Sequence, residues 1–219
     1  MRIAVPGAGE VGALLELPEN PRWMLVLAHG AGAGMSHPFL ASLAREFAAL
    51  DVATLRYQFP YMEEKRRVPD SPEILTASVA AAVRAAAEAA PGLPILAGGK
   101  SMGGRMTSQA AARGLLDGVS GLVFFGFPLH PPKRPSTKRA EHLSDVRVPM
   151  LFLQGARDEF AELSLLRPIV EKLGRLADLE IIEGADHSFH VLKSSGRTDQ
   201  EVLRDLVKRT IAWQTKIIS

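Results

Sequence analysis

The chain has 219 residues, of which 47% are hydrophobic and 23% charged, with a formal net charge of +2 and no cysteine. This composition is close to the globular average of about 45–50% apolar and about 25% charged residues, so neither a fibrous nor a disordered chain is indicated. The absence of cysteine excludes a disulfide framework and a thiolate nucleophile, and the net charge is too small to favour nucleic-acid binding. No apolar run approaches the ~18 residues of a membrane span and the N-terminus lacks a signal-peptide pattern, so we expect one globular domain over residues 1–219, in the cytoplasm.

Short apolar runs alternate with helical patterns along the chain, and this alternation is typical of βα units around a mostly parallel sheet. An N-terminal hairpin is predicted over Ile3–Val5 and Ala13–Leu17. The strands that follow are Trp23–Ala28, Val52–Tyr57, Leu93–Ala97, Leu122–Phe125, Met150–Gln154 and Leu179–Glu183. Several of them are almost continuously apolar, as strands buried on both faces are. We therefore expect an α/β fold with helices on both faces of the sheet.

Three helical stretches can be delimited, and two of them carry clear boundary signals. Ser71 is a suitable N-cap, and Pro72 occupies the first position of a helix that runs to Ala90. A second helical stretch runs from Met102 to about Arg113. Thr198–Glu201 is a capping-box pattern that opens a last helix with one apolar stripe.

Two glycine clusters raise the question of a nucleotide cofactor. Gly7–Gly12 has the G-x-G-x-x-G spacing of a dinucleotide-binding loop, but Pro18 and Pro21 would interrupt the helix that must follow it. We interpret this segment as a hairpin turn and expect no cofactor. The second cluster, His29–Gly34, follows the strand Trp23–Ala28 and is either a flexible turn or a loop that presents backbone N–H groups.

Gly99-Lys100-Ser101-Met102-Gly103 has the pattern G-x-S-x-G, which is weak evidence by itself. Here it directly follows a predicted strand and precedes a predicted helix, which is the setting of a nucleophile elbow. The glycines leave room where the strand and the helix nearly touch. Ser101 is therefore the predicted nucleophile, and the alternative is an ordinary helix N-cap.

A serine nucleophile needs a histidine within hydrogen-bond reach and a carboxylate that orients the histidine. Asp158 follows the strand Met150–Gln154, and His187 follows Leu179–Glu183, so both would lie with Ser101 at one edge of the sheet. Glu159 is an alternative acid and His190 an alternative base. Asp186, His187 and His190 match no common metal-ligand spacing, and we predict no metal site.

Acyl transfer also needs N–H donors where negative charge develops on the substrate oxygen. The elbow offers the backbone N–H of Met102, and the His29–Gly34 loop offers a second, predicted at Ala31. We expect His29, Gly30, Lys100 and Phe59 to contribute to substrate binding, with His29 also supporting this loop.

The same segments carry a resemblance to a known superfamily. The chain resembles the α/β-hydrolases, and within them small lid-less dienelactone-hydrolase-like proteins, in particular bacterial relatives of the hydrolase-like domain of the NSL complex subunit and its testis-expressed cousins. The resemblance lies in five segments: His29–Gly32, Arg56–Tyr61, Gly99–Arg105, Gln154–Asp158 and Asp186–Phe189. It implies a Ser101, Asp158, His187 triad. Dienelactone hydrolases typically have cysteine where this chain has Ser101, so their substrate is not carried over.

The predicted activity is hydrolysis of a carboxylic ester or thioester through an acyl-serine intermediate. The segment from Phe125 to Met150 is too short for a cap domain, which predicts an open pocket for a small-molecule substrate. Basic clusters at Lys65–Arg67 and at Lys133, Arg134, Lys138 and Arg139 fall at the same edge and either attract an anionic substrate or are solvated loop charges. The alternative function is a non-catalytic binding or scaffold domain that retains the fold.

Overall fold

The computed structural model describes residues 1–218, and in this part of the chain eight strands form one sheet in the order β1-β2-β4-β3-β5-β6-β7-β8. Strands β1 and β2 pair in antiparallel fashion, β2 joins β4 in the same way, and the remaining pairs are parallel. The strands are β1 (Arg2–Val5), β2 (Gly9–Glu16), β3 (Trp23–Ala28), β4 (Val52–Tyr57), β5 (Ile95–Lys100), β6 (Val119–Phe125), β7 (Met150–Gly155) and β8 (Ala177–Ile182). The predicted α/β fold with a mostly parallel sheet is confirmed.

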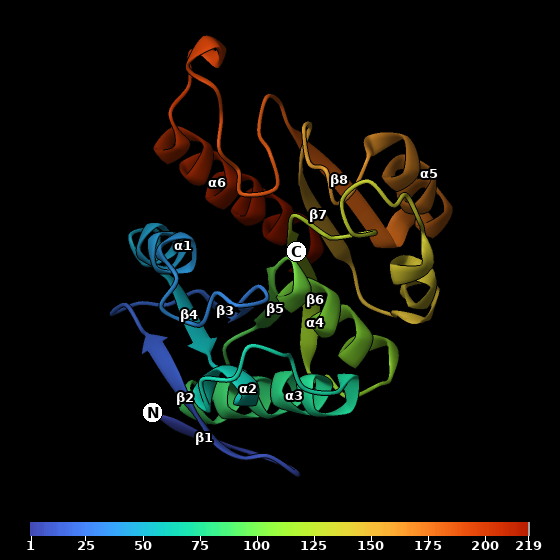
Figure 1. Cartoon of the computed structure of the whole chain (residues 1–219). Coiled ribbons are helices and arrows are strands. Elements are labelled where there is room, and N and C mark those ends of the chain that lie inside the picture. Colours follow the sequence, from blue (N-terminus) through green and yellow to red (C-terminus); the bar gives the residue numbers. More distant parts are fainter. Residues whose placement is uncertain (219) are drawn as a thin grey trace.

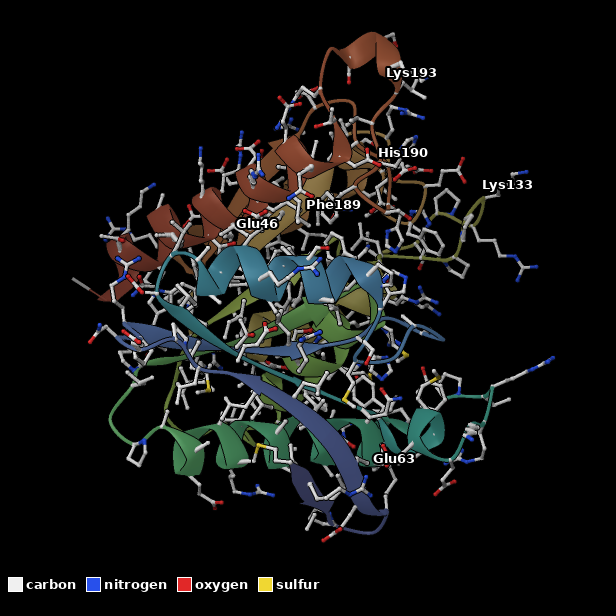
Figure 2. The ribbon with its side chains drawn as sticks, turned by 90° about the vertical axis from the view of Figure 1, so that its left-hand side faces the viewer. Glu46, Glu63, Lys133, Phe189, His190 and Lys193 are labelled. Carbon is white, nitrogen blue, oxygen red and sulfur yellow. The ribbon has the colours of Figure 1, made fainter. Side chains whose placement is uncertain are left out.

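Helices cover both faces of the sheet, as Figures 1 and 2 show. One face carries α1 (Pro38–Ala48) and α6 (Asp199–Ile218). The other carries α2 (Pro60–Glu63), α3 (Pro72–Ala89), α4 (Met102–Ala112) and α5 (Leu163–Leu173). Three short 3₁₀ helices, η1 (Lys138–Asp145), η2 (Gly174–Leu176) and η3 (Lys193–Ser195), lie in the connections.

The central strand β3 shows how the sheet is apolar on both faces. All six of its side chains are buried, and they alternate between two hydrophobic clusters. Trp23, Leu25 and Leu27 pack with the α1–α6 layer, whereas Met24 and Val26 pack with the α3–α4 layer. Side chains alternate across a strand, so a strand between two helical layers has no polar position.

The predicted bounds of β3 and β4 match the structure at both ends, and the capping box before α6 is present, with Thr198 and Glu201 bonded reciprocally at 2.7 and 3.2 Å. The predicted strand Leu93–Ala97 is displaced, because β5 continues through Gly98 and Gly99 to Lys100. A Cβ atom at Gly98 would lie 1.9 Å from the carbonyl oxygen of Val123. The glycines therefore allow close strand pairing here and do not end the strand.

The connection between β6 and β7 contains η1 and no α-helix, so no cap domain lies over the sheet edge, as predicted. This leaves the carboxyl ends of the parallel strands open from above. Within residues 1–218, no helix has both the length and the apolarity needed to cross a lipid bilayer.

Candidate active site

Ser101 occupies the sharp turn between β5 and α4. Its backbone has φ 52° and ψ −117°, a region that residues with side chains rarely adopt. The turn is held on both sides, because the Ser101 N–H donates to the Phe125 carbonyl at 3.1 Å and the Arg105 N–H donates to the Ser101 carbonyl at 3.1 Å. A strained residue persists only when its surroundings fix it, and such residues cluster at functional sites.

Two glycines let α4 approach the end of β3. A Cβ atom at Gly99 would lie 2.3 Å from the Ala28 carbonyl oxygen, and one at Gly103 would lie 2.4 Å from the same oxygen. Both distances are too short for any side chain. The spacing of glycines around Ser101 therefore follows from backbone contacts, as the sequence pattern predicts.

The structure brings Ser101, His187 and Asp158 into one chain of hydrogen bonds. Oγ of Ser101 lies 2.9 Å from Nε2 of His187, and Nδ1 of His187 lies 2.7 Å from Oδ2 of Asp158. When Nδ1 carries the proton and donates it to the carboxylate, Nε2 presents a lone pair to the serine hydroxyl. Ser101 does stand at the N-cap position of α4, but its side chain makes no capping bond.

Asp158 is held by two further donors. Nε2 of Gln154 donates to Oδ2 at 2.5 Å, and the N–H of Phe160 donates to Oδ1 at 2.8 Å. Gln154 is itself fixed, since its Oε1 accepts from the Phe127 N–H at 2.9 Å. No role for Gln154 is predicted from the sequence, although a polar residue at the end of a buried apolar strand is a signal that could have found it.

The alternative acid Glu159 and the alternative base His190 do not join the hydrogen-bond chain of Ser101, His187 and Asp158. The ring of Phe160 stacks on the ring of His187, with centroids 4.2 Å apart. His190 instead bonds to Asp199, at 2.8 Å, and 58% of its side chain is exposed. Glu159 is exposed and makes no contact with His187. In the part of the chain that the structure describes, no three acidic or histidine side chains are grouped to hold a metal ion.

The backbone N–H groups of Ala31 and Met102 flank Ser101 in different segments. The loop of Ala31 is ordered by neighbouring bonds: the Gly32 N–H donates to the Tyr61 hydroxyl at 3.0 Å, and the Ala33 N–H donates to the Gly30 carbonyl at 3.2 Å. Residues 1–218 supply no acceptor for the N–H of Ala31 or of Met102. Two free donors near the hydroxyl of Ser101 would suit an oxyanion if one develops there.

A cavity of about 300 Å³ opens over Ser101. Gly30 and Lys100, both predicted to contact substrate, line it together with Ala31 and His187. The other residues of the lining are mostly apolar, and no contact with substrate is predicted for them from the sequence. They are Ala33, His37, Phe39, Leu40, Phe160 and Ser188.

His29 and Phe59 are placed differently from the expectation that they contact substrate. Both side chains are fully buried outside the cavity lining. Nε2 of His29 accepts from the Phe59 N–H at 3.1 Å, and Nδ1 lies 2.8 Å from the Gly30 carbonyl. Burial lowers the pKa of His29 to about 4. The neutral ring thus supports the Ala31 loop from behind, and this corrects the predicted substrate contact.

The basic clusters do not reach the cavity either. Arg66 pairs with Glu64 at 2.6 Å and with Asp70 at 2.5 Å. Lys133 lies on a loop that projects away from the sheet edge (Figure 2). Among the described residues, Lys100 is the one lysine or arginine in the lining of the cavity. The lysines and arginines of the two clusters lie outside this lining, and all of them are exposed except Arg139, which is partly buried. This placement favours the second of the two interpretations of the clusters.

Comparison with known proteins agrees with this fold. A family model described as an alpha/beta hydrolase domain matches residues 21–215. Similar solved structures include a dienelactone hydrolase from Anabaena variabilis (TM-score 0.78, covering 99% of this chain and 98% of that one), a serine hydrolase homologue from Coxiella burnetii (0.76, 96% and 95%) and a serine hydrolase without a lid from Xanthomonas campestris (0.72, 95% and 93%). Each is 20% identical in sequence, so the likeness concerns the fold.

Proposed function

The chain belongs to the alpha/beta hydrolase domain family, and from this premise we propose that it is a serine hydrolase that cleaves a carboxylic ester or thioester through an acyl-Ser101 intermediate. One observation carries the proposal. Oγ of Ser101 is bonded to His187, which is bonded to Asp158, and this chain of bonds stands at a strained elbow beside an accessible cavity. An ordinary structural serine needs none of these features.

In the acylation step, Oγ of Ser101 attacks the carbonyl carbon while its proton passes to Nε2 of His187. The carbonyl electron pair moves onto oxygen, where the N–H groups of Ala31 and Met102 stabilise the negative charge. When the tetrahedral intermediate collapses, the bond to the leaving oxygen or sulfur breaks. The leaving group takes the proton from His187, and Asp158 keeps the imidazolium oriented throughout.

Deacylation repeats the steps with water as the nucleophile. His187 accepts a proton from the water as the water oxygen attacks the acyl carbon. When the bond between this carbon and Oγ of Ser101 breaks, His187 returns the proton to Oγ. The acid is released and the hydroxyl is regenerated. The open edge of the sheet supports this step, because water reaches the acyl-enzyme without a lid having to move.

The cavity supports a small or extended substrate with an apolar portion. Phe39 and Phe160 form two of its walls, and Leu40, which belongs to α1, forms another. Its volume of about 300 Å³ is at the lower end of the usual range for small-molecule sites. Binding an acyl or alcohol group here removes apolar surface from water on both sides.

The test is labelling with a fluorophosphonate, which reacts with activated serines. The wild-type protein is expected to be labelled, and the Ser101→Ala variant is expected to lose both the label and about 10⁶-fold of the rate on activated esters. Ser144→Ala, which removes an exposed hydroxyl on η1, is the control and retains both. A folded wild-type protein without label would favour the binding or scaffold function instead.

Three narrower statements stay predictions. The relationship to the NSL subunit and testis-expressed proteins is one, and its test is whether those proteins share the five segments that carry the resemblance. The single domain over residues 1–219 is another, and one cooperative unfolding transition is expected; of this range Ser219 lies outside the described residues. The cytoplasmic location is the third, and cell fractionation tests it.

A further inference from the structure

Lys100 joins the nucleophile strand to the histidine loop. It is the last residue of β5, directly before Ser101, and its Nζ donates to the main-chain carbonyl of His187 at 2.5 Å. The two residues are 87 positions apart in sequence. A single side chain therefore ties the elbow to the backbone of the loop that carries the base.

The amine lies close to the pair formed by His187 and Asp158. A Cβ atom placed on Gly126 would lie 2.9 Å from Nζ of Lys100, and 3.5 Å from both Oδ2 of Asp158 and Nδ1 of His187. All three atoms therefore lie within 3.5 Å of the position of this Cβ atom. Gly126, with φ 71°, leaves the space that the amine occupies.

The rest of the amine's surroundings hold it in place. Nζ stands 5.3 Å from the ring centroid of Phe189, a residue of the same loop as His187, which adds a cation–π contact. The charged groups that face it are Asp158, which follows β7, and Asp186, which follows β8; the imidazole of His187 lies beside them. Burial lowers the pKa of Lys100 to about 8, and the two aspartates oppose this shift.

We propose that Lys100 is a positioning residue that holds the imidazole of His187 against Ser101 by clamping the main-chain carbonyl of His187. The inference rests on the proposed hydrolase function. The ammonium form donates the stronger hydrogen bond and is attracted to Asp158 and Asp186. The neutral amine loses both effects, so the loop is free to shift and the distance between Nε2 of His187 and Oγ of Ser101 grows.

The first experiment is Lys100→Met, which keeps nearly the length of the side chain and removes the charge. A displacement of about 1 Å at a reacting group costs about 10²-fold, so kcat and the fluorophosphonate labelling rate are expected to fall by about that factor. KM is expected to stay near the wild-type value, because the amine is directed at the protein and not at the substrate. Lys193→Met is the matched control, since Lys193 lies on the exposed tip of the loop with η3 (Figure 2).

The second experiment is the pH profile of the labelling rate. In the wild-type protein the rate is expected to fall above about pH 8, as the Lys100 ammonium loses its proton. Lys100→Arg stays charged throughout this range, so its rate is expected to show no such fall, whatever its absolute value. A purely structural role for the side chain would change the level of the curve and leave its shape unaltered.

The outcomes separate the two proposals. A folded wild-type protein that takes no label contradicts the hydrolase function itself. A labelled wild-type protein contradicts the role of Lys100 alone if Lys100→Met keeps its kcat, if that variant raises KM instead of lowering kcat, or if the wild-type rate does not fall up to about pH 10. Should Lys100→Met fail to fold, the profiles of the wild type and of Lys100→Arg decide the matter.

Discussion

Gln154 donates from its side-chain nitrogen to Oδ2 of Asp158 at 2.5 Å. The same carboxylate oxygen accepts from His187, so Oδ2 serves two donors from two neighbouring strand ends. Gln154 lies in β7 and is fully buried. The strand that leads to Asp158 thus also carries the side chain that fixes the orientation of this carboxylate.

Gln154→Met is expected to lower the labelling rate about 10–100-fold, because Asp158 loses the donor that orients it. It is also expected to destabilise the fold by ~1–3 kcal/mol, since the buried Phe127 N–H loses its acceptor. Denaturant unfolding and labelling kinetics measure the two effects. Gln214→Met on α6 is the control for activity, and an equal loss of rate in both variants would contradict the assignment.

Asp158→Asn tests the orienting carboxylate. An amide can present its NH₂ group to Nδ1 and so favour the tautomer that has no lone pair toward Ser101, and the rate is expected to fall about 10⁴-fold, as in a serine protease with this change. Glu159→Gln is the matched control, since Glu159 adjoins Asp158 in the sequence. It is expected to leave the rate close to that of the wild type, because Glu159 is exposed and His187 bonds to Asp158. The reverse ranking of the two variants would make Glu159 the acid.

Gly103→Ala tests the contact between α4 and the end of β3. The added Cβ would lie 2.4 Å from the Ala28 oxygen and 2.6 Å from the His29 oxygen, so the free energy of unfolding is expected to fall by ~3 kcal/mol or more. Gly118→Ala, at φ 75° with open space around it, carries only backbone strain of ~1–2 kcal/mol. Equal costs in chemical denaturation would show that the steric argument at the elbow is wrong.

The buried, neutral ring of His29 is expected to make the free energy of unfolding fall in acid. Its pKa is about 4 in the folded protein, whereas an exposed histidine has a pKa of 6.5, so the unfolded chain takes up a proton first as the pH falls. The stability from this residue is complete above pH 6.5 and declines toward pH 4, by an amount on the order of 3 kcal/mol. Urea unfolding at several pH values measures the decline. His29→Gln is expected to flatten it, and an unchanged slope would count against the neutral buried ring.

The sequence predicts the central strands well because the signal there is local. Strands such as β3 and β4 are continuous apolar runs, and their two-sided burial leaves no competing pattern. The predicted end of β5 is wrong because Gly98 and Gly99 are usual strand breakers, whereas here they lie against the carbonyl groups of Val123 and Ala28 on neighbouring strands. Such a contact between distant segments is not visible in a linear pattern.

The same limit applies to the site. The order of Ser101, Asp158 and His187 along the chain predicts residues that the structure brings within hydrogen-bond distance. The side of the loop on which His29 and Phe59 are buried depends on how that loop packs, and the sequence has no marker for it. The contribution of Gln154 and Lys100 likewise emerges only when strand ends are neighbours in space.

The groups that meet at the elbow come from distant parts of the chain. Ser101 and His187 are 86 positions apart in the sequence, and Asp158 lies 29 positions before His187. During synthesis the elbow segment emerges from the ribosome long before the loop that carries His187. Under the proposed hydrolase function, a growing chain holds Ser101 without its proton acceptor, and a fragment cut between β6 and β8 is expected to take no fluorophosphonate label. The proposed reactivity of Ser101 would then require that the segment with His187 has been made and folded.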